Sequence, residues 1–384
     1  MRLLSSKNST FVFLTSLVIC TVMDFNEYKD KEKIESIDLR DNKTFTSLDG
    51  NQLKLFKNLK KLTIENTELE SLPAEIGQLT QLQELVLRNN QLNSLPTEIG
   101  QLTQLQKLDL SFNKLNSLPT EIGQLTQLQK LYLSSNKLKS LPEQIGQLKQ
   151  LQELELSGNQ QLESLPEQIG QLTQLKTLNL SYNKLKSLPA EINGLTQLQE
   201  LDLRNNQLKL LPKQIGQLTQ LKTLYLYHNQ LESLPDEIGQ LTQLQKLYLS
   251  SNKLKSLPEQ IGQLKQLQEL ELSGNQQLKS LPEQIGQLTQ LQKLVLSENQ
   301  LESYPTEING LIQLQKLDLG NNKLKSLPEQ IGQLIQLKTL DLRNNQLESL
   351  PEQIGQLTQL QELDLYGNQQ LKSLPEQIGQ LTQL

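Results

Sequence analysis

The stretch LQELVLRNNQLNSLPTEIGQLTQ, residues 82–104, decides the fold, because near-copies of it fill most of the chain. One pattern recurs from Leu59 onward: L-x-x-L-x-L-x-x-N-x-L-x-x-L-P-x-x-I-x-x-L-x-x. Fourteen repeats follow one another, eleven of 23 residues and three of 24, and they begin at Leu59, Leu82, Leu105, Leu128, Leu151, Leu175, Leu198, Leu221, Leu244, Leu267, Leu291, Leu314, Leu337 and Leu360. Self-similarity at such a period indicates stacked repeats rather than two or three separate globular domains.

The spacing within each repeat predicts a short strand. In LQELVL, Leu85 and Leu87 alternate with variable residues, which is strand periodicity. So short a strand cannot bury its apolar face alone, but stacked copies pair in parallel and merge their leucines into one continuous core. Asn90 and its equivalents are expected to bond the backbone of the bend and of neighbouring repeats. Proline cannot donate to a sheet, so the segment after Pro73 and its equivalents is expected to turn back through a short helical turn.

Seven aliphatic columns, an Asn column and a Pro column agree across the fourteen repeats, and they resemble the leucine-rich repeat family. The LPxxIGxL form is similar to Ras-group leucine-rich repeats and to exported leucine-rich repeat proteins of leptospiral spirochaetes. The resemblance implies an α/β fold: a right-handed curved solenoid with short parallel β-strands on its concave face. Short helical turns or irregular segments would form the convex face, and binding would take place on the concave one.

The N-terminus has a different composition. Arg2 and Lys7 precede the uncharged run FVFLTSLVICTVM, residues 11–23. This run is shorter than the ~20 residues that a membrane-spanning helix needs. A basic start followed by a short apolar run predicts an export signal over residues 1–23. The alternative is an apolar tail on a cytosolic protein.

The tetrapeptide LVIC resembles the lipobox of bacterial lipoproteins, which implies lipidation of Cys20 and a membrane contact through that anchor alone. Ile19 departs from the small residue that normally precedes such a cysteine. Residues 24–33 form a polar linker, residues 34–58 a divergent N-terminal capping repeat, and residues 59–384 the fourteen repeats plus an incomplete last one.

Composition excludes several classes of function. The net charge of −5 is spread along the chain without a Lys/Arg cluster, so no nucleic-acid partner is expected. No phosphate-binding glycine loop and no Cys/His zinc spacing is present, so neither cofactor nor metal is predicted. A triad around the single histidine, His228, with Ser250 and Asp202 would stand on an open face without an oxyanion hole, so no enzyme is predicted. Three aspartates share one strand column and form either a solvated acidic stripe or a weak attraction for a hard cation: Asp318, Asp341 and Asp364.

The third, fifth, seventh and eighth places of each repeat vary, and seven of the eight aromatic residues after Leu59 occupy them: Phe112, Tyr132, Tyr182, Tyr225, Tyr227, Tyr248 and Tyr366. Only Tyr304 replaces a core leucine. Tyr225 and Tyr248 share the fifth column of adjacent repeats and should therefore stand side by side. Such aromatics either stabilise the sheet or form a recognition patch. The candidate partner-binding residues on the concave face are Tyr225, Tyr227, His228, Tyr248, Asp202, Arg204, Tyr182 and Tyr132.

Two irregularities interrupt the pattern. The three long repeats carry SGNQQL at residues 157–162 and 273–278 or YGNQQL at residues 366–371, with an extra Gln and a Gly that is expected to relax the backbone there. Residues 121–175 also match residues 237–291 at every position but one, Glu163 against Lys279, which indicates duplication.

The sequence therefore predicts a non-enzymatic protein-protein interaction module that is exported or surface-associated and binds a host or matrix protein. The alternative is an intracellular scaffold that binds a small GTPase or another signalling protein. Leu384 ends the sequence without a polar terminal repeat, which stacked repeats normally need. We expect that the chain self-associates through this C-terminal edge, that the end frays, or that the sequence is a fragment or frame-disrupted version of a longer protein.

Overall fold

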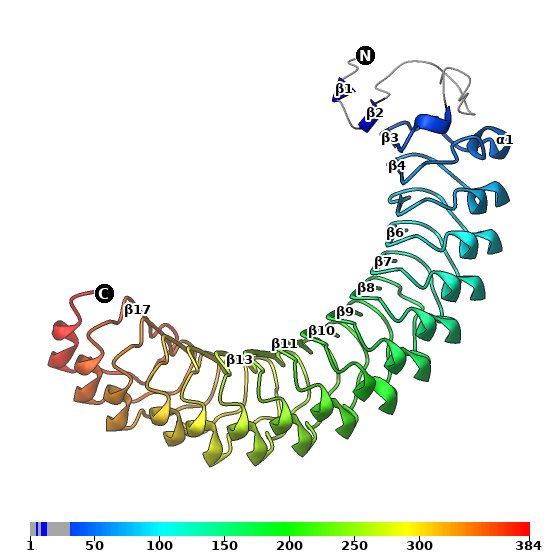
Figure 1. Cartoon of the computed structure of the whole chain (residues 1–384). Helices are drawn as coiled ribbons and strands as arrows, with labels where there is room; N and C mark the ends of the chain where they lie inside the picture. Colours follow the sequence, from blue (N-terminus) through cyan, green and yellow to red (C-terminus); the bar gives the residue numbers. More distant parts are fainter. Residues whose placement is uncertain (1–4, 7–8, 14–30) are drawn as a thin grey trace. The chain divides into compact units, whose positions relative to one another are not determined.

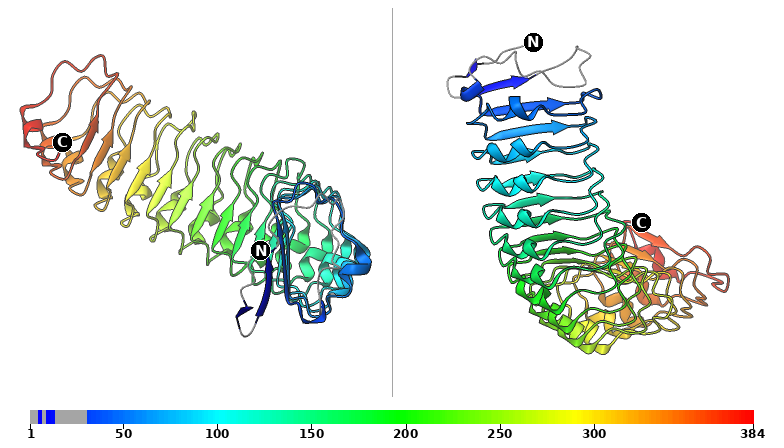
Figure 2. Two further views of the ribbon diagram at one scale, coloured as in Figure 1. Left: turned by 90° about the horizontal axis from the view of Figure 1, so that it is seen from above. Right: turned by 90° about the vertical axis from the view of Figure 1, so that its right-hand side faces the viewer.

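The computed structural model describes residues 5–6, 9–13 and 31–384 and divides into two compact halves, Met1–Leu198 and Gln199–Leu384. Within each half, short parallel strands lie along one side and single-turn 3₁₀ helices lie along the opposite side (Figure 1). Two further views show the same arrangement of strands and turns in each half (Figure 2). Cys20, nearly all of the export run and most of the polar linker lie outside the described residues.

The described residues of the N-terminal half form nine strands: β1 (Ser5–Ser6), β2 (Ser9–Phe13), β3 (Ser36–Arg40), β4 (Lys61–Glu65), β5 (Glu84–Val86), β6 (Lys107–Asp109), β7 (Lys130–Tyr132), β8 (Glu153–Glu155) and β9 (Thr177–Asn179). β1 pairs antiparallel with β2, and β2 to β9 pair in parallel in chain order. The helices are η2 (Lys31–Lys33), α1 (Gly50–Leu53), η3 (Ala74–Gln78), η4 (Thr97–Gln101), η5 (Thr120–Gln124), η6 (Glu143–Gln147), η7 (Glu167–Gln171) and η8 (Ala190–Gly194).

The C-terminal half contains eight strands, all parallel and in chain order: β10 (Glu200–Asp202), β11 (Thr223–Tyr225), β12 (Lys246–Tyr248), β13 (Glu269–Glu271), β14 (Lys293–Val295), β15 (Lys316–Asp318), β16 (Thr339–Asp341) and β17 (Glu362–Asp364). Its 3₁₀ helices are η9 (Lys213–Gln217), η10 (Asp236–Gln240), η11 (Glu259–Gln263), η12 (Glu283–Gln287), η13 (Thr306–Gly310), η14 (Glu329–Gln333), η15 (Glu352–Gln356) and η16 (Glu376–Gln380).

The strand register places identical columns side by side. Leu108 pairs with Leu85 of the preceding strand and with Leu131 of the following one, and all three are 0% exposed. The predicted strands, parallel pairing and shared leucine core are confirmed in both halves. Tyr304 takes a core leucine position as predicted, at 6% exposure, and its hydroxyl donates to Asn309 Oδ1 over 3.0 Å.

The Asn column forms the predicted ladder. Asn136 donates through Nδ2 to the carbonyl oxygens of Leu110 (2.9 Å) and Leu133 (3.1 Å), and its Oδ1 accepts from the Leu115 N–H (3.0 Å). Its side chain is buried, at 7% exposure. Each ladder amide therefore satisfies backbone groups of its own repeat and of the preceding repeat, which have no partner in the sheet.

The residue before each ladder Asn adopts a left-handed conformation whether or not the repeat is long. Gly158 has φ +74°, but Phe112, Tyr182 and His228 in ordinary repeats have φ of +58°, +56° and +55°. The expectation that glycine relaxes the backbone specifically for the inserted Gln is therefore wrong. The bend after each strand from β3 to β17 requires the conformation, and glycine adopts it without the steric cost that a bulky residue carries.

The extra residue of a long repeat does break one bond of the ladder. In an ordinary repeat Leu138 N donates to the next ladder amide, Asn159 Oδ1, over 3.1 Å. In the long repeat Leu162 N instead donates to the Asn159 carbonyl oxygen, over 2.9 Å, and Asn183 Oδ1 stays buried without a hydrogen-bond partner. A buried amide oxygen without a donor costs about 1–3 kcal/mol.

Deleting Gln161 is therefore expected to stabilise the N-terminal half by about 1 kcal/mol, because 23-residue spacing lets Leu162 N donate to Asn183 Oδ1. Urea unfolding followed by circular dichroism measures the change. Gln161→Ala, which keeps the spacing, is the control and should shift the midpoint little. A deletion variant that unfolds at lower urea than the parent would show that the longer loop is itself stabilising.

Candidate protein-binding site

Four aromatic side chains meet on strands β11 and β12 and the bend after β11. Tyr225 and Tyr248 pair in register, and their rings stack with centroids 5.0 Å apart and planes 5° apart. Tyr227 stands edge-on to Tyr225, with centroids 6.5 Å apart and planes at 84°. His228 lies edge-on to Tyr227 at 5.6 Å and is exposed. The adjacency predicted from the columns is confirmed for these residues.

Arg204, from the preceding repeat, joins the aromatic rings to a carboxylate. Its guanidinium lies 5.7 Å from the centroid of Tyr225 and 5.6 Å from that of Tyr227, and it donates a hydrogen bond to the Tyr227 hydroxyl. Its Nε lies 2.9 Å from Asp202 Oδ2. We call Asp202, Arg204, Tyr225, Tyr227, His228 and Tyr248 the tyrosine cluster.

Asp202 differs from its prediction, because a residue of an exposed column was expected and the side chain is buried, at 4% exposure. Its Oδ1 turns back to accept the backbone N–H of Arg204 over 3.1 Å. Burial raises the pKa of this carboxyl above its ordinary value, although Arg204 opposes the rise. Asp202 therefore orients Arg204 from below the surface and does not itself offer a contact to a partner.

Arg204→Met is expected to destabilise the C-terminal half by about 1–3 kcal/mol at pH 7, because it leaves the buried Asp202 carboxylate without its counter-charge. The difference from the parent should shrink at pH 4. Burial already raises the pKa of Asp202, so its protonated fraction grows as the pH falls, and a neutral acid needs no cation. Urea unfolding at both pH values measures it. In an Asp202→Asn background the same change should show no such pH dependence; an equal loss at both pH values in the parent background would refute the pairing.

The Tyr248 hydroxyl is held by two residues that the sequence argument did not select. It donates to Glu269 Oε2 over 2.8 Å, and Lys246 Nζ lies 2.9 Å from Glu269 Oε1. Burial and this hydrogen bond raise the pKa of Tyr248. Burial acts to raise the pKa of Glu269, but the hydrogen bonds from Lys246 and Tyr248 outweigh it and lower that pKa. In the sequence, the alternation of Lys and Glu at the third place of adjacent repeats could have indicated these contacts.

The tyrosine cluster presents polar edges and hydroxyls more than ring faces. The faces of Tyr225 lie toward Arg204 and Tyr248, and each of the three tyrosines is only partly exposed. Tyr227 accepts a hydrogen bond from Arg204, so its own O–H remains available to donate. Ring edges carry partial positive charge, so the surface suits carbonyl oxygens and aromatic faces of a partner better than cations.

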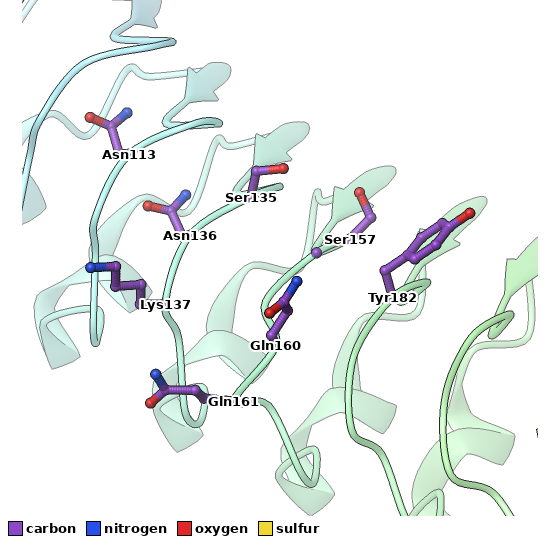
Figure 3. A pocket seen from close by; sticks show the side chains of 9 residues that line it. Asn113, Ser135, Asn136, Lys137, Ser157, Gln160, Gln161 and Tyr182 are labelled. Atoms are coloured by element: carbon purple, nitrogen blue, oxygen red, sulfur yellow. The ribbon is translucent and has the colours of Figure 1, made fainter.

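The other two candidate tyrosines, Tyr132 and Tyr182, belong to the N-terminal half. Tyr132 repeats the environment of Tyr248: its hydroxyl donates to Glu153 over 2.5 Å, and Lys130 Nζ lies 2.7 Å from Glu153. Tyr132 pairs in register with Asp109 on β6, whereas Tyr248 pairs with a tyrosine, Tyr225, on β11. Tyr182 is 54% exposed and stands beside an open hollow between loops (Figure 3).

The three predicted acidic residues also align. Asp318 pairs with Asp341, and Asp341 with Asp364. Burial, together with these neighbours, raises the pKa of Asp341. Within the described residues no group of three or more His, Cys, Asp or Glu side chains is placed to hold a metal ion. The described part of the chain also contains no helix that is long and apolar enough to span a membrane.

Stacked short parallel strands, an Asn ladder and 3₁₀ turns on the opposite side are the features of a leucine-rich repeat protein. Comparison of the sequence with family models gives the same result. Residues 34–135, 104–179, 160–253 and 300–384 match the family model described as a leucine-rich repeat region, and residues 242–301 match a second leucine rich repeat model. The chain belongs to the leucine-rich repeat family. No curated protein matched it.

Among solved structures, the chain is similar to a leucine-rich repeat protein of Leptospira interrogans, with 46% identity, a TM-score of 0.80, and coverage of 88% of this chain and 85% of that one. The plant peptide hormone receptor RGFR1, solved in complex with RGF2, is 30% identical over 92% of this chain and 66% of its own, with a TM-score of 0.68. An internalin of Listeria monocytogenes shares the fold at 24% identity, with a TM-score of 0.63 and 87% coverage of each chain.

Proposed function

We propose that this protein is a non-enzymatic binding module, exported or associated with a bacterial surface, that engages a host or matrix protein through the strand side of its repeats. The tyrosine cluster is the contact. The observation that carries the proposal is the stacked pair Tyr225–Tyr248, with Tyr227 and Arg204 packed against it. Tyr and Arg dominate the energetics of protein interfaces, because they bury large surfaces and still form hydrogen bonds.

The packing of the cluster favours binding because it reduces the conformational entropy that the side chains lose when a partner associates. The stack, the Arg204 hydrogen bond and the Glu269 hydrogen bond hold three tyrosine rings in place before a partner arrives. Side chains that are already fixed lose little freedom on association, so more of their contact energy appears as affinity. The similarity to a receptor solved with a bound peptide hormone supports a protein or peptide ligand, and the basic-apolar start of the sequence supports export.

The experiment is a capture of host-cell and matrix proteins on the immobilised full chain. The test variant carries Tyr225→Ser, Tyr227→Ser and Tyr248→Ser. The matched control carries Phe112→Ser, Tyr132→Ser and Tyr366→Ser, three aromatic residues outside the cluster. A partner retained by the parent and the control but lost by the test variant supports the proposal, whereas equal retention by all three contradicts it.

Cell fractionation tests the location. Export predicts protein outside the cytoplasm with the first residues removed, and lipidation predicts a lipid on an N-terminal Cys20. Protein found only in the cytoplasm with Met1 in place would favour the intracellular scaffold that binds a small GTPase or another signalling protein.

A further inference from the structure

An open hollow lies in the N-terminal half, along the loops that follow strands β6 to β9 (Figure 3). Successive repeats contribute to it, and its lining residues are Asn113, Ser135, Asn136, Lys137, Ser157, Gly158, Gln160, Gln161 and Tyr182. It belongs to no part of the tyrosine cluster, whose residues all lie in the C-terminal half.

The long repeat creates the hollow. Gly158 has no side chain where other repeats carry one, and a Cβ built there would lie 3.2 Å from Ser135 Oγ. Ordinary repeats have one residue between the ladder Asn and the next leucine, whereas this repeat has two, Gln160 and Gln161, and both are exposed. Tyr182 stands on the far side with its ring 54% exposed and its backbone at φ +56°. A bulky residue in the left-handed region costs energy, so the fold does not explain a tyrosine at this place.

Several polar groups of the hollow are free. The amides of Asn113 and Asn136 are used by the ladder. Among the described residues, the side chains of Lys137, Gln160 and Gln161 form no hydrogen bond or ion pair. The hollow thus offers one aromatic face, one ammonium and two free primary amides, and no carboxylate lines it.

The duplicated stretch provides an internal comparison. Residues of the same type recur in the C-terminal half at Asn229, Ser251, Asn252, Lys253, Ser273, Gly274, Gln276 and Gln277. Gly274 likewise has a positive φ, +70°, and Ser273 donates to Ser250 as Ser157 does to Ser134. The one difference is Glu298, which stands at the place of Tyr182 with the same left-handed backbone, φ +58°. At the positions that line the hollow, the two sets of residues therefore differ by an aromatic ring against a carboxylate.

We propose that the hollow beside Tyr182 binds an acidic sugar residue of a polysaccharide. Sugar hydroxyls both donate and accept, which matches the primary amides of Gln160 and Gln161. The apolar face of a sugar ring can pack on the exposed Tyr182 ring, and a carboxylate or sulfate pairs with Lys137 Nζ. In the second copy Glu298 removes the ring and repels the acid, so that copy does not bind.

Calorimetric titration of the full chain tests this, with a hexasaccharide of alternating glucuronic acid and N-acetylglucosamine as probe. Binding to one site is expected. Tyr182→Glu, which places the residue of the second copy at this position, and Lys137→Ala should each weaken binding at least about tenfold. Glu298→Tyr should raise the number of sites from one to two. All these side chains are exposed, so circular dichroism should show an unchanged fold.

Two comparison ligands test separately whether binding needs the negative charge and whether it needs the sugar ring. A neutral hexasaccharide of N-acetylglucosamine should bind at least about tenfold more weakly, because it leaves Lys137 unpaired. A glutamate hexapeptide should not bind measurably, because it has no ring to pack on Tyr182. The inference is overturned if the acidic hexasaccharide gives no heat at millimolar concentration, if Tyr182→Glu binds as the parent does, or if the peptide binds equally well.

Discussion

Asn136→Ala will lower the free energy of unfolding by about 2 kcal/mol. The substitution leaves the buried N–H of Leu115 without a partner. It also removes one of the two amide donors of the Leu110 and Leu133 carbonyl oxygens, which keep their bonds from Asn113 and Asn159. A buried group that loses its only hydrogen bond costs about 1–3 kcal/mol, and the weakened carbonyl bonds add a smaller amount. Urea unfolding followed by circular dichroism measures the loss.

The control for the ladder is Lys137→Ala, the exposed residue next along the chain, which should change the free energy of unfolding by less than about 0.5 kcal/mol. Stacked repeats contact mainly their neighbours, so the Asn136 variant is also expected to unfold in two steps, with its N-terminal half first. A loss below about 1 kcal/mol would mean that the ladder amide contributes little beyond what water can replace.

Rebuilding the tyrosine cluster in the N-terminal half will restore partner binding to a chain that has lost it. The required frame already exists there: Val86, Asp109 and Tyr132 pair in register across β5, β6 and β7. Arg88 already lies 4.6 Å from the ring of Phe112. Four substitutions complete the copy: Val86→Asp, Asp109→Tyr, Ser111→Tyr and Phe112→His.

These four changes, made in the Tyr225→Ser, Tyr227→Ser, Tyr248→Ser background, should recover the parent dissociation constant to within about tenfold, measured by surface plasmon resonance against the captured partner. Adding Tyr132→Ser should abolish the recovery, because it removes one ring of the new stack. A folded rebuilt variant that stays inactive would show that binding needs residues specific to the C-terminal half.

Much of the fold could be predicted because the residue pattern that forms one strand, one bend and one turn is repeated fourteen times. A one-residue slip would turn every leucine outward, so periodicity alone fixes the register. That register placed Tyr225 beside Tyr248, which the 5.0 Å stack confirms. It equally placed the aspartates of the fifth column in one line.

The direction and burial of a side chain could not be predicted from its position within the repeat. Asp202 and Asp364 share a column, yet Asp202 is buried and Asp364 is partly exposed. The difference depends on the neighbours: Asp202 folds back onto Arg204 beneath the aromatic rings. Glu269 likewise became part of the site only through the direction of the Tyr248 hydroxyl.

The effects of the inserted glutamine also escaped prediction. Its local bulge is visible in the sequence, but the lost bond at Asn183 Oδ1 lies in the following repeat. The hollow beside Tyr182 arises from the same insertion together with the absent side chain of Gly158. Both are consequences of stacking, which a single repeat does not encode.

The most direct test of the account is the dissociation constant of the captured partner for the full chain and for the variant with Ser at Tyr225, Tyr227 and Tyr248. Each anchor contributes about 2 kcal/mol in comparable interfaces, with incomplete additivity, so binding should weaken at least about 100-fold. The control variant with Ser at Phe112, Tyr132 and Tyr366 should remain within about threefold of the parent. Equal affinity of the parent and the cluster variant, with both folded, would contradict the claim that the tyrosine cluster is the binding site.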